Sequence, residues 1–246
     1  MNVLPYSLFS KVVVECNGTD ISQQNNLSYP YLGYLTTLFS YSDVCKNSYL
    51  KSLLWESDQV GSHSANSKTA NSGYNARYAM MKEAKEIHFS SPIMSDLFFC
   101  KKYLPTHLNL KIEFLKSADK FYFMGQSAAI KDKLRLRFTK LEIMARTVHV
   151  IPEFLDSQAS MFLKQPAKIP LISSSCRFQS IPSGITDFEI NTIYSGLSPS
   201  LILVGILDNN SVYGSYELNP YSIGKTMTII TFLTYLTLNS FQNTIM

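Results

Sequence analysis

Strict alternation of apolar and polar residues over positions 107–117 constrains the fold of this chain more than any other feature. In "HLNLKIEFLKS" the apolar positions are Leu108, Leu110, Ile112 and Phe114, and the polar positions between them are Asn109, Lys111 and Glu113. A period of two places the apolar side chains on one face of an extended chain. The pattern therefore predicts an antiparallel strand with one buried face and one solvated face.

A hairpin is predicted near the N-terminus. The run Val12–Cys16 is rich in β-branched residues and leads directly into Asn17-Gly18. This dipeptide favours the two-residue turn that joins antiparallel strands, because both of its residues tolerate positive φ.

Composition extends these local patterns to a fold class. Charged residues make up only 16% of the 246 residues, and there are fifteen Tyr and fifteen Phe. Further strand patterns are predicted at 85–91, 119–124, 133–150, 169–184, 187–196 and 201–207, without regular strand–helix–strand alternation. We therefore expect an all-β protein with helical insertions, of the sandwich or jelly-roll type rather than a doubly wound sheet.

Helical spacing interrupts the strand patterns in two places. Residues 29–55 place apolar side chains on common helical faces, and Pro152 opens a second helix predicted over 153–164. Pro166 and Pro170 close that second segment, which makes it the best candidate for a connection between domains. Residues 56–73 are small, polar and aperiodic, and predict a long exposed loop.

The stretch "LILVGILDNNSVYGSYELNP" at 201–220 allows two interpretations. An acidic residue at the end of a buried strand, as Asp208 would be, is a common catalytic position in α/β enzymes. In an all-β protein, Asp208, Asn209 and Asn210 are turn formers, and Gly214 and Pro220 separate them from the next strand. The absence of an acidic residue nearer to Asp208 than Glu217 favours the turn.

The charge pattern argues against a specific nucleic-acid site. The net charge of +4 is spread along the chain, and the densest basic stretch is Lys131–Lys140. Its charges alternate with apolar residues, so a solvated strand face is favoured over a nucleic-acid groove, which clusters more basic residues.

Cysteine usage and targeting signals bound the location of the chain. Cys16, Cys45, Cys100 and Cys176 lack metal-ligand spacing and are expected to be free, mostly buried thiols in a reducing compartment. No signal peptide is recognisable, so secretion is not expected. The apolar run 227–238 is shorter than the roughly 17 to 25 residues of a membrane span.

No enzyme class is favoured, and no catalytic, cofactor-binding or metal-binding residue is assigned. The histidines His63, His88, His107 and His149 are far apart in sequence, and no GxSxG motif is present. Gly224-Lys225-Thr226 matches the end of a phosphate-binding loop, but Asn219 stands where the first glycine of that motif is needed.

Five phrases in one order resemble a known family. They are "SLFSKVVVECNGTDIS" (7–22), "YPYLGYLTTLFSY" (29–41), the run from "SGYNARYAMMKEAKEIHF" to "KSADKFYFM" (72–124), "SIPSG" (180–184) and "GLSPSLILVGILDNNSVYGSYELNPYSIGK" (196–225). Together they resemble the double jelly-roll, hexon-type major capsid proteins of Polinton (Maverick) elements and adintoviruses, including copies in animal genomes.

The resemblance implies two jelly rolls of about eight strands each, side by side in one chain. Residues 1–151 would form the C-terminal part of the first roll, 152–166 the linker helix and 167–246 the beginning of the second roll with a divergent tail. Family members extend beyond both ends of this sequence, so we expect a copy truncated at both ends.

The function expected from the resemblance is structural. The chain would self-associate into trimeric capsomers, contact other capsid proteins, need no cofactor, and reside in a virion or in the host cytoplasm or nucleus. Three alternatives remain. They are a minor, penton-type capsid protein, a host-recruited ligand- or carbohydrate-binding β-sandwich using Tyr213, Tyr216 and Tyr221, and a jelly-roll enzyme with a metal-binding His/carboxylate cluster.

Overall fold

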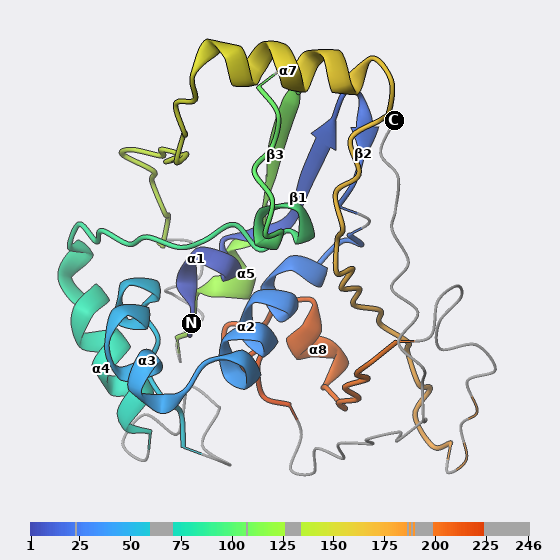
Figure 1. Ribbon diagram of the computed structural model, residues 1–246. Helices are drawn as coiled ribbons and strands as arrows, with labels where there is room; N and C mark the ends of the chain where they lie inside the picture. Colours follow the sequence, from blue (N-terminus) through green and yellow to red (C-terminus); the bar gives the residue numbers. More distant parts are fainter. Residues whose placement is uncertain are drawn as a thin grey trace.

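The computed structural model describes residues 1–22, 24–59, 71–106, 108–125, 134–185, 187, 189 and 199–223 (Figure 1). The described residues of 1–125 and 208–223 contain the buried side chains, with the exception of Ile169, and we call them the compact region. Residues 134–207 are called the outer segment, and those of them that the structure describes are mostly exposed.

A three-stranded antiparallel sheet in the order β2-β1-β3 organises the compact region. β1 (Phe9–Cys16) pairs along its length with β3 (Leu110–Lys116), and Val12 lies opposite Phe114. Alternate residues of β1 are buried, beginning with Ser10. The predicted antiparallel strand is therefore confirmed as β3, with Ile112 and Phe114 half-buried against the core. Its buried face is wrong at Leu110, which is exposed.

The N-terminal hairpin is confirmed as well. β2 (Thr19–Asp20) returns alongside β1, with Cys16 opposite Thr19. The two residues between the strands, Asn17 and Gly18, have φ values of 50° and 81°. Positive φ at both positions is what a two-residue turn with the right-handed strand twist needs.

Helices cover the buried face of the sheet, as Figure 1 shows for α2 (Ser28–Ser40) beneath β1. The helical spacing predicted for 29–55 is thus confirmed. The other helices of the compact region are α1 (Leu4–Ser7), α3 (Asp43–Asn47), η1 (Tyr49–Leu53), α4 (Ser72–Met81), η3 (Lys82–Ala84), η4 (Asp96–Phe99), α5 (Asp119–Tyr122) and α8 (Asn209–Val212).

Aromatic rings dominate the core between the sheet and α2. Tyr34 stacks on Tyr221 with 4.3 Å between ring centroids, and Tyr31 meets Tyr221 edge to face at 5.7 Å. A Cβ at Gly33 would lie 2.5 Å from the Tyr6 ring, so glycine is what allows α1 to approach α2 so closely. Tyr221, far along the chain, is therefore a core residue of the compact region.

A buried ion pair joins α4 to the N-terminal residues. Arg77 contacts the carboxylate of Asp58, with side chains only 4% and 6% exposed, and also donates to the carbonyl of Glu56. Asn2 donates to the same carbonyl and accepts from the Glu56 amide. The predicted exposed loop 56–73 is confirmed at 56–59, which form no helix or strand, although the Asp58 side chain is buried. It is wrong at its end, where Ser72 and Gly73 belong to α4. Residues 60–70 lie outside the described residues.

Several predicted strands do not pair. Residues 119–124 form α5 and its continuation, because Phe121 and Tyr122 are both buried, and a helical turn can direct adjacent side chains inward where a strand cannot. Residues 85–91, 134–150, 169–184 and 201–207 form no strand ladder in the part of the chain that the structure describes. Residue 133 and most of the predicted strand 187–196 lie outside the described residues. A period of two fixes the two faces of a segment but supplies no partner strand.

The helix predicted over 153–164 is confirmed as α7 (Pro152–Phe162), with Pro152 in the first helical turn, where its missing N–H is tolerated. No residue of α7 is buried, and Figure 1 shows it lying across one end of the sheet. Leu171, Cys176 and Leu207, all after α7, pack against the core cluster of the compact region. The division at 152–166 and the jelly-roll class remain predictions.

Candidate functional site

The structure brings no set of catalytic side chains together among the residues it describes. His88 and His149 are exposed, and no group of His, Cys, Asp and Glu with the geometry of a metal site occurs in the described ranges. His63, His107, the Gly224–Thr226 motif and the apolar run 227–238 lie outside the described residues. None of the described helices is both long and apolar enough to cross a membrane.

The four cysteines are free thiols. Cys16 is buried under the sheet, whereas the other three are half-buried, so the prediction that most are buried is wrong. Burial raises the pKa of Cys176 to about 11, which disfavours the reactive thiolate at neutral pH.

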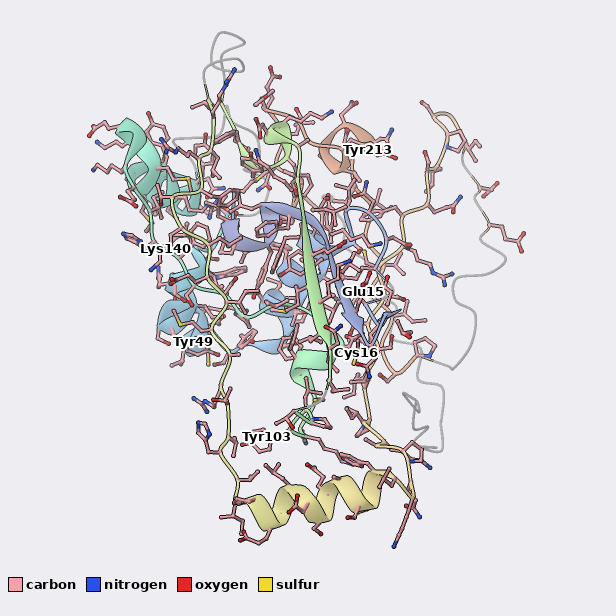
Figure 2. The ribbon with its side chains drawn as sticks, turned by 90° about the horizontal axis from the view of Figure 1, so that it is seen from above. Glu15, Cys16, Tyr49, Tyr103, Lys140 and Tyr213 are labelled. Atoms are coloured by element: carbon pink, nitrogen blue, oxygen red, sulfur yellow. The ribbon has the colours of Figure 1, made fainter. Side chains whose placement is uncertain are left out.

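The predicted tyrosine cluster separates in space. Tyr221 lies in the core, where its hydroxyl is 2.7 Å from the Ser7 hydroxyl, and burial raises its pKa well above the usual value. Tyr213, in contrast, is 60% exposed and lies beside α8 (Figure 2). Spacing in sequence could not reveal this separation, because it depends on the turn at Asn219 and Pro220.

Nearly all of the exposed large apolar side chains after residue 134 lie in the outer segment. They include Phe138, Leu141, Ile143, Met144, Val148, Val150, Ile151, Phe154, Met161, Leu163, Ile172, Leu201, Val204 and Ile206. Figure 2 shows α7 and the extended chain leading to it at the edge of the molecule, apart from the other helices. These exposed apolar side chains are spread over residues 138–206 of the outer segment.

A few contacts hold the outer segment against the compact region. The amide of Ser174 donates to Asp96 at 3.1 Å, and Phe178 meets Tyr31 edge to face at 5.2 Å. Ile169 is buried, whereas its neighbours on both sides are exposed. Burial raises the pKa of Asp96, and the hydrogen bonds from Ser174 oppose that shift.

The two ends of the outer segment differ in charge. Its first part, 134–151, carries Arg135, Arg137, Lys140 and Arg146 against one acidic residue, Glu142. Residues 178–207 carry Asp187 and Glu189 and contain no Lys or Arg. All of these side chains are exposed, with Lys140 at the periphery in Figure 2. The segment is thus basic at one end and acidic at the other.

The chain turns sharply where the outer segment re-enters the compact region. Asp208 caps α8 by accepting a hydrogen bond from the Asn210 amide at 2.7 Å, and its carbonyl accepts from Ser211. The interpretation of these residues as turn formers that end a buried strand is therefore wrong, because Asn209 and Asn210 lie in α8 and residues 201–207 form no strand. The carboxylate of Asp208, which could have been catalytic, is engaged in local backbone capping.

Beyond α8 the turn borders a hollow of about 540 Å³. Its walls include Lys120, Asn209, Asn210, Tyr213, Tyr216 and Glu217. Sequence reasoning found the tyrosines and the turn but missed Lys120, because this residue comes from α5, far away in the sequence.

Comparisons of the chain with protein-family models, with curated proteins and with solved structures find no match.

Proposed function

We propose that this chain is a structural subunit of capsid type that acts by self-association and not by catalysis. The observation that carries the proposal is the outer segment on either side of α7, which exposes many apolar side chains and forms no strand ladder in the part of the chain that the structure describes. Extended chain of this kind is a template for pairing with another chain.

Edge pairing explains both the pattern and the exposure of residues 134–151. Apolar and polar side chains alternate there as in a half-buried strand, although the segment is exposed. A partner strand would satisfy the backbone groups, and a partner surface would cover the apolar side chains, since exposed backbone and apolar groups both gain from burial in a paired state.

The occupant we propose is a second copy of this chain. The basic end of one outer segment complements the acidic end of another, and the two ends differ in sequence, so the contact joins unlike surfaces head to tail. A head-to-tail contact closes into a ring when its rotation permits. A trimeric capsomer, which the sequence resemblance implies, is such a ring.

On this proposal the jelly rolls of the resemblance would complete their sheets in the assembled state, and other capsid proteins would contact the ring at its rim. The proposed location is the virion, or the cytoplasm or nucleus of the host cell during assembly. No cofactor takes part, because the function consists of surface complementarity.

Charge reversal tests the proposal. Arg137→Glu combined with Arg146→Glu reverses the basic end, and Asp187→Lys combined with Glu189→Lys reverses the acidic end. In sedimentation velocity experiments, we expect the wild type to form trimers or larger particles. We expect each reversed chain to associate about tenfold more weakly, because like charges then face each other across the contact.

The matched control carries both reversals, which restores complementarity with opposite polarity, and should recover association to within a few-fold of the wild type. A wild-type chain that stays monomeric at high concentration contradicts the proposal. So does a monomer that binds metal stoichiometrically, which would favour an enzyme on the same scaffold.

A further inference from the structure

The geometry points to a binding site for neutral carbohydrate in the hollow between α5 and α8. The hollow, of about 540 Å³, falls within the range of small-molecule sites and holds one or two sugar rings. It uses residues separate from the charged ends of the outer segment, so this inference stands or falls independently of self-association.

The floor of the hollow is rigid. Gly214, with φ of 89°, brings the loop so close to α5 that a Cβ there would lie 2.8 Å from the Phe121 amide nitrogen. The carbonyl of Tyr216 accepts from the Gly125 amide at 2.8 Å. Behind the loop, Val212 is buried, and the carbonyl of Pro220 accepts from the Tyr31 hydroxyl at 3.1 Å. Such a preformed site loses little conformational entropy when a ligand binds.

An exposed aromatic ring supplies the platform. Tyr213 borders the hollow and is 60% exposed, although α8, to which it is attached, packs through Val212 into the interior. The C–H face of a pyranose ring is apolar and matches the face of an aromatic ring, which gains from covering it. A solvent-exposed tyrosine at the rim of a rigid hollow is suited to this stacking.

Polar groups around the platform match sugar hydroxyls, each of which both donates and accepts hydrogen bonds. The amides of Asn209 and Asn210 offer donors and acceptors, Lys120 donates, and the carboxylate of Glu217 accepts. The hydroxyl of Ser215 already accepts from the Glu217 and Leu218 amides at 3.2 and 3.4 Å, which leaves its proton for donation.

The charge balance selects the class of sugar. One ammonium, that of Lys120, and one carboxylate, that of Glu217, border the same hollow. A phosphate or a sialic acid would meet the carboxylate as well as the ammonium, so its attraction is cancelled at close range. An uncharged hexose uses both groups as hydrogen-bonding partners and has no net charge to oppose.

A glycan array carrying neutral, sialylated and sulfated oligosaccharides tests the assignment with the purified full chain. We expect the wild type to bind neutral hexose-containing glycans and to keep its ranking of ligands in 0.5 M NaCl, a salt level at which attraction between exposed charges is screened. Binding of sulfated or sialylated glycans alone, or of no glycan, would overturn the inference.

Variants locate the site. Tyr213→Ala should weaken binding about tenfold, whereas Tyr213→Phe should keep most of it, because stacking needs the ring and not the hydroxyl. The matched control is Tyr103→Ala, at a tyrosine that is 78% exposed and lies toward α7, away from the hollow (Figure 2). Equal effects of Tyr213→Ala and Tyr103→Ala would overturn the assignment.

A second pair of variants guards against misfolding at Tyr213. Glu217→Gln and Asn210→Ala, both at exposed positions, should each weaken binding several-fold while the circular dichroism spectrum and the sedimentation profile stay those of the wild type. Binding of AMP in place of sugar, measured by isothermal titration calorimetry, would assign the tyrosine platform to a nucleobase and reject the carbohydrate.

Discussion

The compact region and the outer segment are built from similar residues with opposite outcomes. Both contain alternating apolar and polar stretches, yet β1 buries one face and β3 half-buries Ile112 and Phe114, while most apolar side chains of residues 134–151 are exposed. The difference lies in partners, because β1 has β3 on one side and α2 on its face. An apolar pattern stabilises a fold only where a second surface covers it.

The same contrast separates stability from association. Free energy of folding is concentrated in the aromatic core of the compact region, whereas the outer segment contributes few buried side chains and a large apolar surface. Substitutions in the first region should therefore change unfolding, and substitutions in the second should change self-association.

The largest expected effect comes from a pair of phenylalanines. Phe121 is 1% exposed and Phe154 on α7 is 52% exposed. Phe121→Ala should lower the free energy of unfolding by about 3 to 5 kcal/mol, since it leaves a cavity in the core. Phe154→Ala should lower it by less than about 0.5 kcal/mol. Urea unfolding followed by tryptophan fluorescence measures both, and equal losses would contradict the division into two regions.

The buried ion pair comes next. Asp58→Asn leaves the Arg77 guanidinium buried without its counter-charge, and should cost about 3 kcal/mol of unfolding free energy. The double variant Asp58→Leu with Arg77→Met removes both charges and should recover most of that loss. Chemical denaturation of the two variants checks the ordering; a double variant as unstable as Asp58→Asn would show that the contribution is not electrostatic.

Alkaline pH should weaken the compact region. Burial raises the pKa of Tyr29 to about 12 from the usual value of 10, so between these values the folded chain holds a proton that the unfolded chain releases. The contribution of Tyr29 to the free energy of unfolding is therefore fully present below pH 10. As the pH rises towards 12, this contribution falls by about 2 to 3 kcal/mol. Tyr29→Phe should make the decline shallower by the share of this one group in urea titrations at pH 9 to 11, because Tyr34 and Tyr122, whose pKa burial also raises to about 12, still contribute.

Alanine substitutions at two glycines with positive φ distinguish the cost of backbone strain from the cost of steric overlap. Gly214 and Gly184 have φ of 89° and 85°, but only at Gly214 does a Cβ meet backbone atoms, at 2.8 Å. Gly184→Ala should cost about 1 kcal/mol from backbone strain alone, and Gly214→Ala about 1 kcal/mol more. Thermal unfolding of both variants measures the difference, and identical costs would show that the loop at Gly214 moves freely away from α5.

The smallest effect on stability is expected at Met144, which is 90% exposed in the outer segment. Met144→Ser should change the unfolding free energy by less than about 0.5 kcal/mol, because no buried contact is lost. It should nevertheless reduce self-association in sedimentation experiments. A loss of stability without a change in association would reverse the roles assigned to the two regions.

Local patterns in the sequence were sufficient for several elements. Asn17-Gly18 favours a tight hairpin, and Pro152 starts a helix. The alternation over 107–117 predicts which side chains of β3 share a face. Each of these signals depends on residues close together in the chain, so no tertiary information is needed to interpret it.

Candidate sites were harder to predict, because their residues are far apart in the chain. The hollow combines Lys120 of α5 with the loop after α8, and the ion pair joins Asp58 to Arg77 across the intervening loop. Neither pairing follows from local spacing, since each depends on how distant segments pack.

By itself the sequence determined the faces of the strands, the hairpin turn, the helix at Pro152 and the neutral, aromatic-rich character of the chain. Tertiary structure alone decided which apolar faces are covered, that Tyr221 is a core residue and Tyr213 a surface one, and that Asp208 caps a helix. The reason is that periodicity is a property of neighbouring residues, whereas burial is a property of the partner that a segment finds.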